Sequence, residues 1–123
     1  MAKMKILIAE DSPTAVEMFR HTLEPLGCEI VVAQDGEEAA RKCADEHPDV
    51  LIVDVIMPRM NGFQLCRALR KLAQTREVPI IIVTSMDRES DRYWGLKQGA
   101  DEYLVKPVDS ALLLQKVKSY LPV

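Results

Sequence analysis

Five short apolar segments recur along this chain, and each of the first four is followed by a longer segment with helical signals before the next begins. The apolar segments cover residues 5–9, 30–33, 50–53, 80–83 and 103–105. Runs of this length, rich in Val, Ile and Leu, are typical of strands that are buried on both faces. Alternating strands and helices favour a parallel sheet with helices on either side. The sequence therefore predicts an α/β fold.

The segments between the strands, and the one after the last, carry residues that start and stop helices. The expected helices begin near Pro13, Asp35, Asn61, Arg88 and Ser110, and end near Gly27, His47, Leu72, Gln98 and Leu121. Capping side chains and Gly or Pro at the ends support these limits. Pro25 should loosen the last turn of the first helix.

Apolar spacing predicts which helical side chains face the core. The third helix should bury Leu65, Leu69 and Leu72. On the fourth helix, Tyr93, Leu96 and Ala100 share one face and should point inward. Trp94 lies one step round that helix, so we expect it on the solvent side.

Right-handed crossovers and a site between the first and third strands favour the flavodoxin-like strand order 2-1-3-4-5. At 123 residues, the chain has the length of one domain with a substantial core. It contains no linker, repeat or low-complexity stretch. We therefore expect a single domain over residues 1–123, with no effector domain.

Charge and cysteine content exclude several classes of protein. A net charge of −3 argues against a surface for nucleic acid or for an anionic membrane. No apolar run approaches the ~20 residues that span a bilayer, and the N-terminus leads into a strand rather than a signal peptide. The three cysteines show no Cys-x-x-Cys spacing, so we expect free thiols in a reducing cytoplasm.

Polar side chains follow four of the five predicted strands. Glu10 and Asp11 come after the first, Asp54 after the third, Thr84 after the fourth and Lys106 after the fifth. Parallel strands place their carboxyl ends on one edge of the sheet, where open α/β sheets bind ligands. These side chains should therefore meet in one site.

Three carboxylates in one place repel one another unless a cation is present. Lys106 is one candidate cation, and Mg²⁺ is another, because it takes oxygen ligands and needs only one or two carboxylates. A carboxylate beside a metal, an ammonium and a hydroxyl can attack phosphorus and become an aspartyl phosphate. The acidic pair disfavours a phosphate-binding loop for a flavin or nucleotide at the same place.

The motifs at these strand ends resemble those of the receiver domain of two-component response regulators, the CheY-like family, over the whole chain. They are Ala9-Glu10-Asp11-Ser12, Val53-Asp54-Val55-Ile56-Met57-Pro58, Val83-Thr84-Ser85 and Leu104-Val105-Lys106-Pro107.

The resemblance implies that Asp54 is the phosphoacceptor and that a histidine kinase, or a small phosphodonor, supplies the phosphoryl group. Asp11, Asp54 and the backbone carbonyl of Ile56 would ligate Mg²⁺, and Glu10 would act through water. Such a protein would catalyse only its own phosphorylation and dephosphorylation, and would not be an enzyme.

The resemblance also implies a conformational switch. Thr84 and Lys106 would hold the phosphoryl oxygens, and Lys106-Pro107 would be a cis peptide. Tyr103 would turn inward as Thr84 moves toward the phosphate. A downstream protein would bind the face formed by the fourth helix, fifth strand and fifth helix, including Trp94 and Tyr103. The protein would be a monomer or weak dimer, and its fourth helix resembles regulators of chemotaxis and twitching motility.

Three other interpretations stay open. The chain can be the receiver of a longer transcriptional regulator. A flavin-binding electron carrier shares this fold, although the acidic pair disfavours it. A Mg²⁺-dependent phosphohydrolase would also use an aspartyl nucleophile, but such enzymes need a carboxylate two residues beyond it, where this chain has Ile56.

Overall fold

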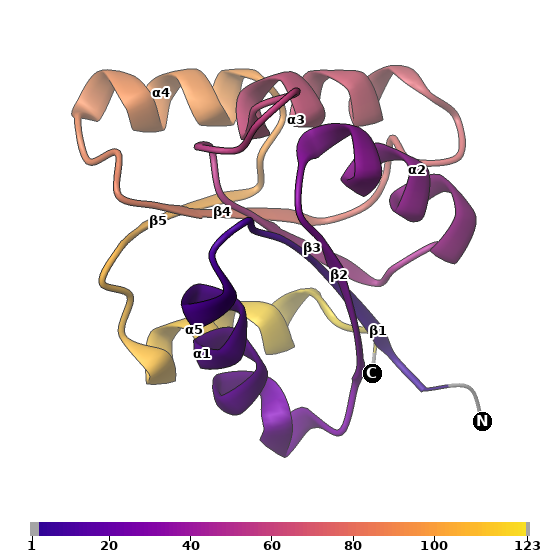
Figure 1. Cartoon of the computed structure of the whole chain (residues 1–123), viewed down its shortest axis with the longest axis vertical. Coiled ribbons are helices and arrows are strands. Elements are labelled where there is room, and N and C mark those ends of the chain that lie inside the picture. The colour runs from indigo at the N-terminus through magenta and orange to yellow at the C-terminus, as the bar shows by residue number, and fades with distance from the viewer. Residues whose placement is uncertain (1–2, 123) are drawn as a thin grey trace.

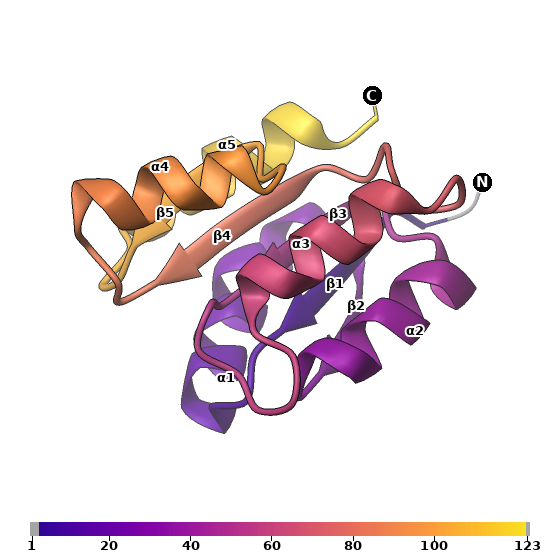
Figure 2. The same ribbon diagram turned by 90° about the horizontal axis from the view of Figure 1, so that it is seen from above.

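A computed structural model shows a central parallel sheet between two layers of helices and describes residues 3–122 (Figures 1 and 2). The strands are β1 (Lys5–Ala9), β2 (Glu29–Ala33), β3 (Val50–Val53), β4 (Ile80–Thr84) and β5 (Glu102–Val105). The helices are α1 (Pro13–Leu23), the 3-10 turn η1 (Glu24–Leu26), α2 (Gly36–Glu46), α3 (Gly62–Lys71), α4 (Glu89–Lys97) and α5 (Ser110–Tyr120).

The strand order is β2-β1-β3-β4-β5, and every neighbouring pair is parallel, which confirms the predicted topology. Ala9 at the end of β1 is in register with Ala33 and with Val53. Thr84 at the end of β4 is in register with Val105. The carboxyl ends of the strands are thus level, and the residues that follow them share one edge.

Alternate side chains of the strands enter two separate cores. One core lies under α2, α3 and the loop after α4, and includes Leu7, Leu51, Ile82 and Leu69. The other lies under α1 and α5, and includes Phe19. The sheet is buried on both faces, as its apolar strands predict.

The first helix ends before Pro25, and its last turn is altered as predicted from that proline. Helix α1 stops at Leu23, and the next three residues form the tighter turn η1. Gly27 follows with a φ of 64°, in the left-handed region that glycine favours.

Two predictions about buried side chains are wrong. Leu72 is 50% exposed, because α3 ends at Lys71 and the backbone at Leu72 is already extended. On α4, Tyr93 and Leu96 are exposed. The buried residue of that helix is Gly95, since the Tyr103 ring occupies the space beside it.

Within residues 3–122, no helix is both long enough and apolar enough to cross a membrane. The three cysteines are free thiols, and Cys43 and Cys66 are buried.

Candidate functional site

Backbone hydrogen bonds continue the sheet beyond the strand ends and position the candidate residues. The amide of Glu10 donates to the carbonyl of Ala33 at 2.9 Å, and the amide of Asp54 donates to that of Ala9 at 3.0 Å. The amide of Lys106 donates to the carbonyl of Thr84 at 2.8 Å. The backbone of these residues is therefore tied to the neighbouring strand end.

The Lys106 ammonium lies between two carboxylates at this edge. Its Nζ donates to Oε1 of Glu10 at 2.7 Å and to Oδ2 of Asp54 at 2.9 Å. Glu10 is 2% exposed and Asp54 is 8% exposed, so both carboxylates are shielded from water, whereas the Lys106 side chain is 27% exposed. The side chains that follow β1, β3 and β5 thus meet in one place, which confirms the prediction for Glu10, Asp54 and Lys106.

Burial and charge act against each other in this cluster. Burial raises the pKa of Glu10, and the neighbouring charge of Asp54 adds to the rise, although the hydrogen bond from Lys106 opposes it. Burial lowers the pKa of Lys106, because it disfavours the charged ammonium. The hydrogen bonds to Glu10 and Asp54 outweigh this effect, so the pKa of Lys106 is raised overall. The cluster stabilises a positive charge beside Asp54.

The second oxygen of Asp54 faces the loop after β3. Its Oδ1 accepts a hydrogen bond from the amide of Ile56 at 3.1 Å, and the Ile56 side chain is 56% exposed. Asp11, directly after Glu10, is exposed. Asp54 thus offers one oxygen to the lysine and one to a backbone donor.

The donor set of this edge suits Mg²⁺. Within residues 3–122, no three acidic, His or Cys side chains converge closely enough to hold a metal unaided, and Lys106 lies between Glu10 and Asp54. Mg²⁺ requires little more than one or two carboxylates, because it keeps several waters and takes phosphate oxygens. The predicted ligands, the carboxylates of Asp11 and Asp54 and the carbonyl of Ile56, are oxygen donors of the kind that Mg²⁺ takes.

Thr84 and Tyr103 are linked through the backbone of Met86, in the loop after β4. Thr84 is fully buried, and its Oγ1 accepts from the amide of Met86 at 3.4 Å. The Tyr103 hydroxyl donates to the carbonyl of Met86 at 2.8 Å. Burial raises the pKa of Tyr103 to about 12, so it remains a hydrogen-bond donor at neutral pH. The predicted cis peptide Lys106-Pro107 is confirmed.

The predicted partner surface of Trp94 and Tyr103 is not one exposed surface in this structure. Trp94 is 46% exposed, on the solvent side as expected. Tyr103 is 2% exposed and points inward. Trp94 lines a hollow next to α3 instead.

An ion pair that the sequence analysis missed ties down the loop after β3. Arg59 has a φ of 67°, and its Nε and Nη2 donate to Oδ2 of Asp35 at 3.0 and 2.7 Å. Asp35 also caps α2 by accepting from the amide of Glu38 at 2.8 Å. A Cβ on Gly36 would overlap the Met60 carbonyl, so the two loops touch. The sequence signalled Asp35 as a cap, but nothing in it linked Asp35 to Arg59.

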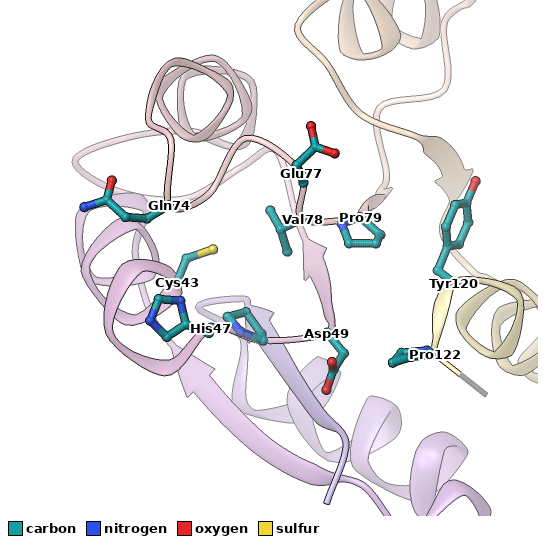
Figure 3. Close-up of a pocket in the computed structure, with 10 residues that line it drawn as sticks. Cys43, His47, Asp49, Gln74, Glu77, Val78, Pro79, Tyr120 and Pro122 are labelled. Carbon is teal, nitrogen blue, oxygen red and sulfur yellow. The ribbon is translucent and has the colours of Figure 1, made fainter. Parts of the chain in front are cut away.

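The hollow in Figure 3 lies at the opposite edge of the sheet, where the strands begin. It has a volume of about 380 Å³, and Cys43, His47 and Tyr120 are among its lining residues. None of the candidate site residues lines it.

Several known proteins are similar to this chain. Residues 6–118 match the model of the response regulator receiver domain. The chain is 43% identical to protein PilH of Pseudomonas aeruginosa over 117 residues, which cover 95% of this chain and 97% of PilH. Other curated relatives, transcriptional regulatory proteins 37–38% identical, are longer, and the chain spans about half of their length (48–52%).

Solved structures show the same fold. The chemotaxis protein CheY4 of Vibrio cholerae has a TM-score of 0.88 at 36% identity, over 98% of this chain and 100% of CheY4. The receiver domain of sensor histidine kinase PA1611 from Pseudomonas aeruginosa, crystallised with magnesium in its active site cleft, has a TM-score of 0.88 at 29% identity, over 97% and 98% of the two chains.

Proposed function

Because this chain belongs to the response regulator receiver family, we propose that it is a signalling switch in which Asp54 accepts a phosphoryl group. The donor is a phosphohistidine of a kinase or a small acyl phosphate. The output is a changed affinity for a partner protein. Receiver domains act as switches and not as dedicated enzymes, which agrees with this proposal.

The observation that supports it most is the placement of Asp54 against Lys106. A nearly buried carboxylate at the end of the central strand β3 has an ammonium 2.9 Å from one oxygen. If Asp54 and Lys106 were only a structural ion pair, that would explain why these two residues lie together. It would not account for Glu10 on the same ammonium and for the buried hydroxyl of Thr84 at the neighbouring strand end.

In the proposed step, one Asp54 oxygen forms a bond to phosphorus. The bond from phosphorus to the donor nitrogen breaks, and its electron pair stays on the imidazole. The Lys106 ammonium shifts from the carboxylate toward the new phosphoryl oxygens, which carry more charge. Thr84 donates its hydroxyl hydrogen to another of these oxygens.

Asp11, Asp54 and the carbonyl of Ile56 are the ligands that we assign to Mg²⁺. When bound, the metal neutralises charge on the transferring group. The Glu10 carboxylate accepts from the Ser12 amide at 3.2 Å and from Lys106, so it fixes the lysine and the start of the loop after β1.

The switch follows from the contacts of Thr84. Its hydroxyl accepts from the amide of Met86, and the carbonyl of Met86 accepts from Tyr103. If the Thr84 hydroxyl turns to a phosphoryl oxygen, the hydrogen bond from Met86 is lost and the loop before α4 is released. Phosphorylation would thus reach α4, where a partner protein can detect it. By likeness to CheY4, we propose a pathway in chemotaxis or twitching-type motility, in the cytoplasm.

A phosphohydrolase with an aspartyl nucleophile fits the site less well. Such an enzyme needs a general acid beside the leaving group. The side chain two residues after Asp54 is Ile56, which is exposed and apolar. The site can therefore take a phosphoryl group but offers no acid at that position to expel an alcohol.

Labelling with acetyl phosphate and Mg²⁺ tests the assignment of Asp54. We expect intact-mass spectrometry to show one phosphoryl group per chain, and none on Asp54→Asn, which keeps the shape but removes the nucleophile. The exposed Asp45 gives a matched control, since Asp45→Asn should label normally. Stoichiometric labelling of Asp54→Asn would overturn the proposal.

A further inference from the structure

A hollow of about 400 Å³ lies between the C-terminal halves of α3 and α4, away from the carboxylates. It is lined by Arg67, Arg70, Lys71, Trp94, Lys97 and Gln98. None of these residues is acidic. Because acidic residues outnumber basic ones 19 to 16 in the chain, this is a local concentration of positive charge on an anionic protein.

Three of the four cations have no carboxylate partner. Arg70 is occupied, because it donates to the carbonyl of Gly99 at 2.7 Å and to Oδ2 of Asp101 at 3.0 Å. Arg67, Lys71 and Lys97 are exposed. Within residues 3–122, no carboxylate oxygen lies within 4.0 Å of their charged nitrogens. The Lys97 ammonium lies 5.8 Å from the centroid of the Tyr93 ring, a weak contact at an exposed site. Arg67, Lys71 and Lys97 therefore have no carboxylate partner and can pair with a ligand.

Trp94 gives the hollow an apolar side. It is 46% exposed, although Gly95 and not Trp94 holds α4 against the core. Cations near helix C-termini are favoured by the helix dipole, which explains Lys71 and Lys97 without a ligand. The dipole does not explain an exposed tryptophan beside them. Trp and Arg together are enriched where proteins bind one another.

We propose that this hollow binds an acidic segment of a partner protein. Carboxylates of the segment pair with Arg67, Lys71 and Lys97, and an apolar side chain covers the Trp94 ring. A long nucleic acid or an anionic membrane fits less well, because either would extend over the rest of a surface whose net charge is −3. Binding here does not require phosphorylation of Asp54.

The chain's only tryptophan reports directly on this site. We would titrate the unphosphorylated protein with a synthetic peptide of glutamates flanking one leucine, and follow Trp94 emission. The matched peptide has glutamine in place of glutamate. We expect a saturable change with the glutamate peptide, weakened by added salt, and none with the glutamine peptide over the same range.

Charge reversal locates the binding. The double variant Arg67→Glu/Lys71→Glu should bind the glutamate peptide about tenfold more weakly or worse, since two attractive charge pairs become repulsive. Arg41→Glu, an exposed cation on α2, should bind as the wild type does. Thermal melts followed by circular dichroism check that each variant is folded.

Three results would overturn the proposal. One is the absence of any saturable change with the glutamate peptide. Another is an equal loss in Arg41→Glu, which would indicate a non-specific charge effect. The third is tighter binding of a single-stranded oligonucleotide or of phosphatidylserine vesicles than of the peptide, which would assign the hollow to another class of partner. None of these results bears on the labelling of Asp54.

Discussion

Helices α3 and α4 cover the same face of the sheet, yet they are attached to it in different ways (Figure 2). Helix α3 buries Leu65, Cys66 and Leu69 completely. Helix α4 buries only Gly95. The first is anchored by apolar side chains, and the second rests on the Tyr103 ring through a residue that has no side chain.

The loops that lead into the two helices also differ in how firmly they are attached. The loop after β3 is held by the ion pair of Arg59 with Asp35, and by the amide of Gly62, which donates to the carbonyl of Val55 at 2.9 Å. The loop after β4 is held through Met86 by Thr84 and Tyr103. We infer that α3 and its loop form a fixed frame for Asp54, whereas α4 and its loop are the part that moves.

The largest expected effect is on the anchored helix. Leu69→Ala should lower the free energy of unfolding by about 2–5 kcal/mol, because it leaves a cavity in the core. Leu96→Ala on α4, where the side chain is 43% exposed, should cost less than about 1 kcal/mol. Urea denaturation measures both. Equal losses would show that the two helices are attached alike.

Gly95→Ala tests the close approach of α4 to the Tyr103 ring. A Cβ there would lie 2.8 Å from Cδ2 of Tyr103, so we expect a loss of about 1–3 kcal/mol from overpacking. Helix propensity alone predicts the opposite sign, a gain of up to about 1 kcal/mol. Ser90→Ala, exposed on the same helix, is the control and should be neutral or slightly stabilising. A more stable Gly95→Ala protein would contradict the close contact.

Tyr103→Phe removes the hydrogen bond to Met86 and should cost about 0.5–1.5 kcal/mol. Hydrogen exchange in residues 85–88 should speed up as well. Tyr120→Phe, which loses a hydrogen bond of 2.6 Å to Glu102, is a matched control and should leave exchange in that loop unchanged. An unaltered loop in Tyr103→Phe would mean that Tyr103 does not restrain it.

The smallest expected effect is a loss of stability at low pH, when the Asp35 carboxylate that holds the loop after β3 becomes protonated. Hydrogen bonds from the Glu38 amide and from Arg59 lower the pKa of Asp35 below its ordinary 3.8. The stabilisation from this carboxylate is therefore complete above pH 3.8 and is lost as the pH falls below it. The stability difference between wild type and Asp35→Asn should stay constant above pH 3.8 and shrink as the pH falls below it. A difference that stays constant would show that the ionised carboxylate adds nothing.

Sequence reasoning succeeded where the pattern was strong. Each strand is a short apolar run, and a parallel sheet brings the residues after those runs to one edge, so the sequence alone predicts that Glu10, Asp54 and Lys106 lie together. The prediction of the buried face of α4 failed, because that helix has no continuous apolar face. Gly95 is its buried residue because it packs against the Tyr103 ring. Sequence reasoning also missed the pair of Arg59 with Asp35, since these residues lie 24 positions apart and no periodicity connects them.

The most direct test of the fixed frame and the moving part is hydrogen exchange with and without phosphorylation. Mass spectrometry would follow backbone exchange of the wild type and of Asp54→Asn, each with acetyl phosphate and Mg²⁺ present or absent. We predict that phosphorylation changes exchange in residues 85–99 and leaves residues 62–71 unchanged, and that Asp54→Asn shows neither change. Equal changes in α3 and α4, or no change at α4 in a fully phosphorylated protein, would contradict the account.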